Sequence, residues 1–176
     1  MTDWSEIVAN HGGIVWKTVF RIVNDVHDAS DCFQEVFVDA LNLSRKQPVT
    51  NWPGLLKRLA TARSIDLLRS RIRSSTEPLT PKSETTLLGL YQPTPLIVEH
   101  KELIEQLRIA LAAMPRDQAE VCCLRYLEAM TYEQISEQMG ISVNHVGVLL
   151  HRSKSTLRLQ LAGFNPEAHA RSETES

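Results

Sequence analysis

The chain lacks any apolar run that approaches the roughly 20 residues of a membrane-spanning helix, so we expect no insertion into a membrane. The first residues, MTDWSEIV, have no basic segment followed by an apolar core, and we expect no signal peptide. Cysteine is also scarce: the chain has only Cys32, Cys122 and Cys123. An odd number of thiols, two of them adjacent, favours buried, reduced cysteines and a cytoplasmic protein.

Motifs for catalysis and metal binding are missing as well. The sequence has no glycine-rich phosphate loop and no G-x-S-x-G turn. His145 and His151 are six positions apart and fall on different helix faces, and the adjacent Cys122 and Cys123 lack the C-x-x-C spacing of a zinc site. We therefore expect no enzymatic activity, no catalytic residue, no cofactor and no metal.

Net charge is low, at −2, but it is unevenly distributed along the chain. Residues 1–40 carry seven acids against two bases, and residues 57–73 carry six bases against Asp66 alone. An acidic surface and a basic surface in the same half of a protein indicate two partners, of which one is a basic protein and the other nucleic acid.

The stretch 124–161 has the pattern of a helix-turn-helix. Thr131 followed by Gln134 matches a capping box, and Gly140 suits the left-handed residue that ends a helix. Ser142 can cap a second helix, whose exposed start is Asn144 and His145. A second helix of this kind reads bases in the DNA major groove. The alternative for this stretch alone is an ordinary αα-hairpin in a helical bundle.

The rest of the chain is also predicted to be helical, which gives an all-α fold. We expect helices at about 4–10, broken at Gly12-Gly13, then at 14–23, 28–43, from Pro53 to about 73, 99–114 and 117–128. Four prolines mark 74–98 as a flexible linker. The predicted organisation is therefore two small helical domains, at 1–73 and 99–163, joined by the linker 74–98 and followed by a tail at 164–176.

Two features of the first domain allow a structural and a functional interpretation. An acidic stripe on helix 28–43 is usually only a solvated face, although docking to a protein would use the same residues. Trp52 stands beside a basic helix, as a base-stacking residue for single-stranded nucleic acid does. Core packing explains Trp52 equally well.

Together these segments resemble an extracytoplasmic-function sigma factor of the sigma-70 superfamily. The resemblance is carried by DASDCFQEVFVDAL (28–41), by NWPGLLKRLATARSIDLLRSRIR (51–73) and by LAAMPRDQAEVCCLRYLEAMTYEQISEQMGIS (111–142). Region 2 of the family would cover about residues 10–73, and region 4 about residues 103–161. Several motifs in the same order at the same separation make this signal stronger than the helix-turn-helix alone.

The resemblance implies that the protein gives promoter specificity to core RNA polymerase. The resemblance assigns docking to the beta-prime clamp helices to Asp28, Asp31, Gln34 and Glu35. It implies that the melted minus-ten element binds here, with a flipped base near the loop 44–51. The residues implied for this binding are Trp52, Lys57, Arg58, Arg63, Arg69, Arg71 and Arg73. The residues implied for recognition of the duplex minus-thirty-five element are Thr131, Ser142, Asn144, His145, His151, Arg152 and Lys154. The implied partners are core RNA polymerase, including its beta flap, promoter DNA and an anti-sigma factor.

The chain departs from the family pattern at two places. Thr61-Ala62 replaces the usual Arg-Asn, and the recognition helix has His-Val-Gly-Val-Leu at 145–149 in place of Thr-Val-Lys-Ser-Arg. Gly147 costs about 1 kcal/mol of helix stability relative to alanine, or it permits close approach to DNA. Two alternatives therefore stay open: a DNA-binding regulator that acts without polymerase, and a sigma-like interaction module that no longer binds DNA.

Overall fold

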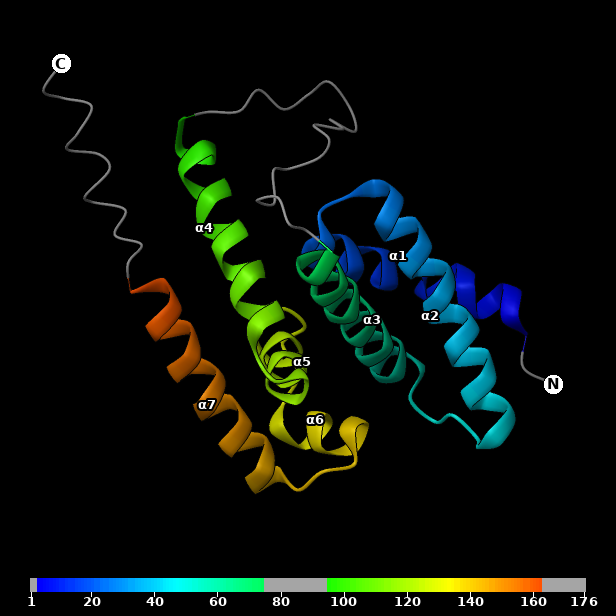
Figure 1. Ribbon diagram of the computed structural model, residues 1–176. Helices are drawn as coiled ribbons and strands as arrows, with labels where there is room; N and C mark the ends of the chain where they lie inside the picture. Colours follow the sequence, from blue (N-terminus) through cyan, green and yellow to red (C-terminus); the bar gives the residue numbers. More distant parts are fainter. Residues whose placement is uncertain (1–2, 75–94, 163–176) are drawn as a thin grey trace, which may run out of the picture.

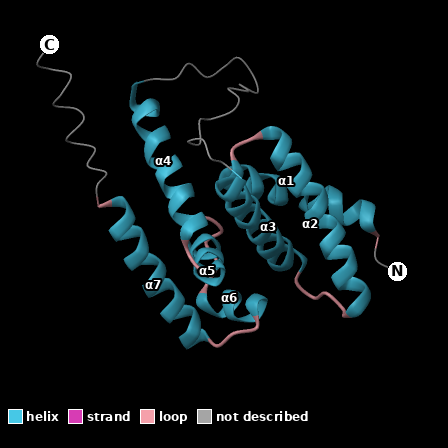
Figure 2. Ribbon diagram, viewed as in Figure 1, coloured by secondary structure: helices cyan, strands magenta, loops and turns pink. Residues whose placement is uncertain are grey.

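The structure is a computed structural model that describes residues 3–74 and 95–162. These residues form helices and connecting turns without any strand (Figures 1 and 2), which confirms the all-α prediction. The helices are α1 (Trp4–Val23), α2 (Val26–Lys46), α3 (Trp52–Ser74), α4 (Pro95–Ala113), α5 (Arg116–Tyr126), α6 (Tyr132–Met139) and α7 (Val143–Leu161). Most of the predicted linker lies outside the described residues. Every helix within them is too short or too polar to cross a membrane.

Helix α1 is continuous, so the predicted break at Gly12-Gly13 is wrong. Asp3 caps the helix by accepting hydrogen bonds from the backbone N–H groups of Ser5 and Glu6. Each interior glycine costs about 1 kcal/mol relative to alanine, but burial of apolar residues on both sides of the pair, such as Ile7 and Val15, outweighs this cost. Tertiary packing therefore overrides the local signal.

Helices α1, α2 and α3 enclose the first core. Its fully buried side chains include Val15, Val19, Val36, Leu56 and Ala60. Helix α2 starts at Val26, earlier than expected, because the carboxylate of Asp25 accepts a 3.0 Å hydrogen bond from the backbone N–H of Asp28. It also extends to Lys46, which shortens the predicted polar loop 44–51 to 47–51.

Helices α5, α6 and α7 enclose another core, around Ile135 and Val146. The predicted capping box is present: Thr131 Oγ1 accepts from Gln134 N at 3.2 Å, and the Gln134 side chain accepts from Thr131 N at 2.9 Å. Gly140 ends α6 with φ +66°, and Ser142 caps α7. The helix-turn-helix prediction is confirmed. Helix α4 begins at Pro95, four residues before the start expected at 99.

The N-terminal half (α1–α3) and the C-terminal half (α4–α7) pack directly against each other. A shared core joins Ile65 and Leu68 of α3 to Leu111, Met114 and Cys123 of the C-terminal half. Helix α3 consequently lies in the middle of the molecule, with α1 and α2 on one side and α4, α5 and α6 on the other (Figure 1). The domain bounds at 73 and 99 stay a prediction.

Candidate nucleic-acid interface

One face of α2 presents the carboxylates and the amide that were predicted to dock onto polymerase. Asp31, Gln34 and Glu35 are exposed. Val38 continues the same stripe one helical turn further and is 56% exposed. An apolar side chain in line with acidic ones adds a hydrophobic contact to a charged surface. The sequence analysis did not select Val38. The spacing 31, 34, 35 and 38 was the available signal.

Two basic residues of α3, Arg63 and Arg71, are paired with carboxylates of α2. Arg63 donates from Nε to Asp39 Oδ2 at 2.6 Å and from Nη2 to Asp39 Oδ1 at 2.8 Å, and its Nη1 lies 3.4 Å from Glu35 Oε2. The hydrogen bonds to Asp39 raise the pKa of the Arg63 guanidinium, and partial burial opposes that rise. Arg71 forms an ion pair with Asp28. The predicted polymerase face and the predicted minus-ten face are therefore connected through side-chain pairs.

Other bases of α3 contact the C-terminal half. Arg69 Nη1 donates to the carbonyl oxygen of Met114 at 3.2 Å. Lys57 Nζ donates to the carbonyl oxygen of Glu128 at 3.3 Å and lies 3.7 Å from Glu128 Oε2. Arg73 instead donates back to the carbonyl oxygen of Arg69 within α3. Most of the minus-ten set therefore already has protein partners in this arrangement.

Trp52, for which core packing and base stacking were equally supported, packs edge-on against Trp4. The two ring centroids are 5.4 Å apart, with an interplanar angle of 86°. Both rings lie against the first core, and this contact favours the packing interpretation. Thr61 is fully buried, so in this arrangement it lies away from any DNA, whereas Ala62 lines the groove between the two halves.

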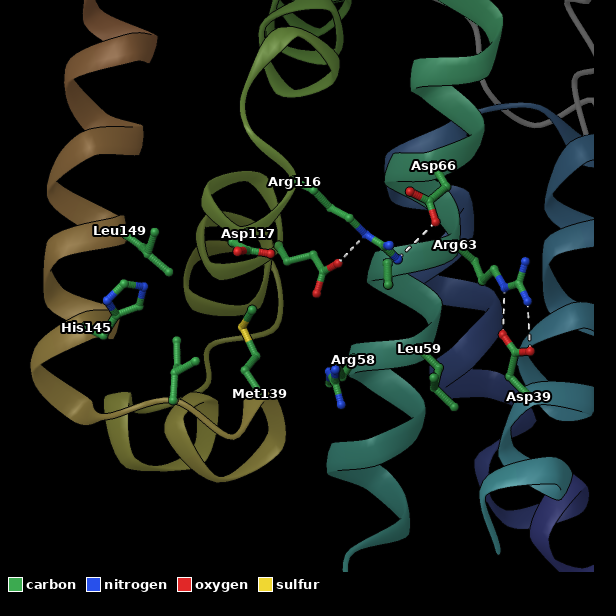
Figure 3. A pocket seen from close by; sticks show the side chains of 13 residues that line it. Asp39, Arg58, Leu59, Arg63, Asp66, Arg116, Asp117, Met139, His145 and Leu149 are labelled. Carbon is green, nitrogen blue, oxygen red and sulfur yellow. Dashed lines mark hydrogen bonds and ion pairs between the residues drawn. The ribbon is translucent and has the colours of Figure 1, made fainter. Parts of the chain in front are cut away.

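This groove has a volume of about 550 Å³ and lies between α3 and the helix-turn-helix (Figure 3). Arg116 spans it: its Nη2 lies 3.0 Å from Asp66 Oδ2 and its Nε donates to Glu120 Oε1 at 2.8 Å. Burial raises the pKa of Glu120, and the Arg116 charge opposes the rise. The charged side chains that line the groove have both signs, and they are Asp39, Asp66, Asp117, Glu120, Arg58, Arg63 and Arg116. Mixed charge of this kind suits a protein surface better than a polyanion.

The start of α7 presents the predicted duplex-reading residues. Asn144, His145, His151 and Arg152 are exposed, with His145 directed toward the groove (Figure 3). Val148 lies among them on the helix surface and is 43% exposed. The sequence analysis did not select it, although its spacing of four from Asn144 and from Arg152 places it on the same face.

The remaining residues of the minus-thirty-five set have local partners. The side chain of Thr131 caps α6 and that of Ser142 caps α7. Lys154 Nζ lies 5.7 Å from the centroid of the Tyr126 ring, in a cation–π contact. A Cβ on Gly147 would be 3.8 Å from the Tyr132 ring, an ordinary contact, so the fold itself does not demand glycine there.

Comparisons with known proteins show which proteins the chain is similar to. Residues 104–157 match the family model described as Sigma-70, region 4. The chain is 27% identical to the ECF RNA polymerase sigma factor SigE of Mycolicibacterium smegmatis over 168 residues, which cover 95% of this chain and 65% of that protein. It is also 27% identical to the ECF RNA polymerase sigma factor SigW of Bacillus subtilis, over 90% of this chain and 88% of that protein.

The chain is similar to extracytoplasmic-function sigma factors over almost its whole length. This confirms the resemblance noted in the sequence. The fold agrees: the sigma factor RpoE in complex with the anti-sigma factor NepR, from Bartonella quintana, matches with a TM-score of 0.54 and 15% identity, over 94% of this chain and 100% of that one. The chain spans slightly less than two thirds of the length of the mycobacterial relative.

Proposed function

We propose that this chain is a sigma factor that binds core RNA polymerase and directs promoter-specific initiation of transcription. The observation that carries the proposal is a helix-turn-helix, matched by the sigma-70 region 4 model, whose second helix exposes Asn144, His151 and Arg152. The exposed acidic face of α2 in the other half supplies a separate docking surface. A protein with two such surfaces can hold polymerase and DNA at the same time.

Docking to polymerase uses the face of α2. The side chains of Asp31, Gln34 and Glu35 are exposed, and Val38 provides an apolar contact in the same row. This combination suits a basic, partly apolar helical surface such as the beta-prime clamp helices. Asp28 takes part after giving up its ion pair with Arg71. The C-terminal half contacts the beta flap.

Recognition of the minus-thirty-five element uses α7 in the major groove. The N-terminal residues of a recognition helix contact base edges, and basic residues hold phosphates on either side. Asn144, His145 and His151 then face bases, while Arg152 and Lys154 contact the backbone. Thr131 and Ser142 stand at helix N-termini, which favour phosphate oxygens.

Binding of the minus-ten element uses α3 and the loop before it. Opening duplex DNA costs about 1.4 kcal/mol per base-pair step in lost stacking. Contacts of the extruded strand with Lys57, Arg58, Arg63, Arg69, Arg71 and Arg73 offset part of that cost. Trp52 can add stacking only by leaving its contact with Trp4. Most of these bases would have to exchange a protein partner for phosphate.

Control by an anti-sigma factor completes the proposal. The similar RpoE structure contains the anti-sigma factor NepR, and a partner of the same class would suit this chain. The groove between the halves has side chains of both charges, which suits a protein ligand.

The test is transcription by purified core RNA polymerase from a library of randomised promoters, with and without the protein. Transcripts that share two spaced upstream elements would support a sigma factor. Reversal of charge at Asp31 and Glu35 should abolish the signal by preventing docking, and Arg152→Ala should weaken selection of the upstream element. Val8→Ala, an exposed position on α1, serves as a control.

Two other outcomes would replace the proposal. Duplex binding without association with core polymerase would indicate a stand-alone regulator, and the charge reversals on α2 would then leave activity unchanged. Association with core polymerase without any transcript, combined with no effect of Arg69→Ala or Arg152→Ala, would indicate an interaction module that does not bind DNA.

A further inference from the structure

Gly147 lies in the interior of α7, on the side of the helix that carries the exposed recognition residues. It is three positions after Asn144 and four before His151, so the three residues are neighbours on the helix surface. Glycine is a poor residue for a helix interior, because it loses more backbone entropy than alanine does. A Cβ at this position would be 3.8 Å from Cε2 of Tyr132, an ordinary van der Waals contact. The packing around Gly147 therefore leaves room for a side chain.

A glycine that packing does not require is not by itself a binding site. Gly13 in α1 is another example, because a Cβ there would meet nothing within 4 Å. The surface around Gly147 distinguishes it from Gly13. Val143 and Val148 on α7 are 40% and 43% exposed, and Tyr132 at the start of α6 is 37% exposed. Gly147 is thus a position without a side chain among exposed side chains of the helix-turn-helix.

Two cations lie near this surface, and each is held against an aromatic ring. The Arg125 guanidinium lies 5.8 Å from the centroid of the Tyr132 ring, which is the neighbour of Gly147. Lys154 is seven positions after Gly147, about two helical turns along the same side of α7, and its Nζ lies 5.7 Å from the Tyr126 ring centroid. Cation–π contacts of this kind keep the charges close to the protein surface. A phosphate must therefore come close to the helices to meet them.

The exposed residues in the middle of the recognition surface have short side chains. Asn144, Val148 and His151 follow one another at helical spacing, and each is shorter than arginine or lysine. Base edges lie inside the major groove, so short side chains reach them only when the helix backbone is close to the bases. The family pattern noted in the sequence has lysine at position 147, which can hold a phosphate at the end of a flexible stem. Glycine instead lets a ligand approach the helix backbone.

We propose that Gly147 determines how closely α7 approaches duplex DNA, with its bare backbone and the Tyr132 ring in contact with the deoxyribose groups of one strand. This inference rests on the proposed function, because it assigns the minus-thirty-five element to α7. The apolar faces of the sugars meet Gly147 and Tyr132, and neighbouring phosphates meet Arg125 and Lys154. Gly147 is therefore a positioning residue, which brings the short recognition side chains within reach of the bases.

A side chain at position 147 then has two opposite effects. Gly147→Ala should raise the stability of the protein, because alanine loses less backbone entropy and its Cβ makes an ordinary contact with Tyr132. The same methyl group should weaken recognition of the upstream element about tenfold, because it moves the helix outward and costs about one base contact. A residue with a purely structural role would not lose DNA recognition while the fold gains stability.

The experiment is transcription by core RNA polymerase with this protein, from a promoter of the library and from the same promoter with a scrambled upstream element. The holoenzyme concentration for half-maximal transcription is measured on both promoters, and the ratio of the two concentrations reports recognition by α7. We expect Gly147→Ala to lower this ratio about tenfold and to raise the urea midpoint of unfolding. Gly13→Ala makes the same chemical change in α1 and should raise the midpoint without changing the ratio.

Gly147→Lys separates distance from charge. Lysine adds a cation but also a long side chain, so we expect weaker recognition than in the wild type, with a steeper dependence on salt concentration. Recognition by Gly147→Ala that equals or exceeds that of the wild type would overturn the proposal. So would tighter recognition by Gly147→Lys at physiological salt, or an alanine variant that is less stable than the wild type. Wild-type protein that directs no transcription from any promoter would instead contradict the proposed function itself.

Discussion

Arg63 donates two parallel hydrogen bonds to Asp39, at 2.6 Å and 2.8 Å, and these bonds connect the basic helix α3 to the acidic helix α2. The Arg63 side chain is 38% exposed and that of Asp39 is 27% exposed, so water screens the pair only in part. Forked pairs of this geometry are the stronger class of surface ion pair. Glu35 joins them at 3.4 Å but is 58% exposed.

The first prediction concerns this pair. A double-mutant cycle with Asp39→Asn and Arg63→Gln should give a coupling free energy of about 1 kcal/mol in urea unfolding. The same cycle with Glu35→Gln and Arg63→Gln should give about 0.3 kcal/mol, because that contact is longer and more exposed. Equal coupling in the two cycles would show that the forked geometry adds nothing.

The helix-turn-helix could be predicted from the sequence because its signals are local. Thr131, Gln134, Gly140 and Ser142 each act within their own turn of chain, and all of them have the predicted role in the structure. The acidic stripe on α2 followed in the same way from helical spacing. Val38 and Val148 obey that spacing too, but an exposed valine has no distinctive signal until its neighbours are known to leave it exposed.

The contact between the halves could not be predicted, because it depends on residues far apart in the sequence. Glu128 and Thr18 are 110 positions apart, and nothing near Glu128 distinguishes it from an ordinary surface acid. At Gly12-Gly13 the local signal was misleading. It predicted a break in the helix, but the burial of Ile7 and Val15 on either side keeps the helix continuous.

The second prediction uses this continuous helix. A Cβ added at Gly13 would meet nothing within 4 Å, and the position is exposed. Gly13→Ala should therefore raise the free energy of unfolding by about 0.5–1 kcal/mol, since alanine loses less backbone entropy in a helix. Chemical denaturation measures the change. Gly140→Ala is the contrasting variant, because φ is +66° there, and it should lower stability by about 1 kcal/mol. Destabilisation by Gly13→Ala would mean that α1 bends at this site.

The third prediction concerns pH and Glu120. Burial raises the pKa of this carboxyl above its ordinary 4.5, with Arg116 opposing the change. Between the unfolded and the folded pKa the folded protein holds more protons than the unfolded one, so the contribution of Glu120 to stability falls as pH rises through that window. Glu120→Gln removes this titration.

The stability difference, Glu120→Gln minus wild type, should therefore become more positive as pH rises from about 4 and level off above the window. Loss of the Glu120–Arg116 pair adds an offset to the variant, while Arg116 keeps its contact with Asp66. Urea unfolding across this pH range measures the difference, with the exposed Glu137→Gln as control. A difference that does not change with pH would show that Glu120 titrates as it does in water.

The last prediction concerns Val148, the exposed valine in the row of Asn144, His151 and Arg152. In a major groove an apolar side chain at the centre of such a row meets the C5-methyl group, by which thymine differs from the other bases. Burial of one methyl is worth about 0.8 kcal/mol, or about fourfold in affinity.

The measurement is duplex binding to the upstream element found in the promoter library, with each thymine replaced in turn by uracil, which lacks only that methyl group. Wild type should lose about fourfold at one position, and Val148→Ala should be indifferent to the same replacement. Val38→Ala, which changes an exposed valine in the other half, should keep the wild-type pattern. A uracil profile that is identical in wild type and Val148→Ala would assign thymine recognition to a different side chain of α7.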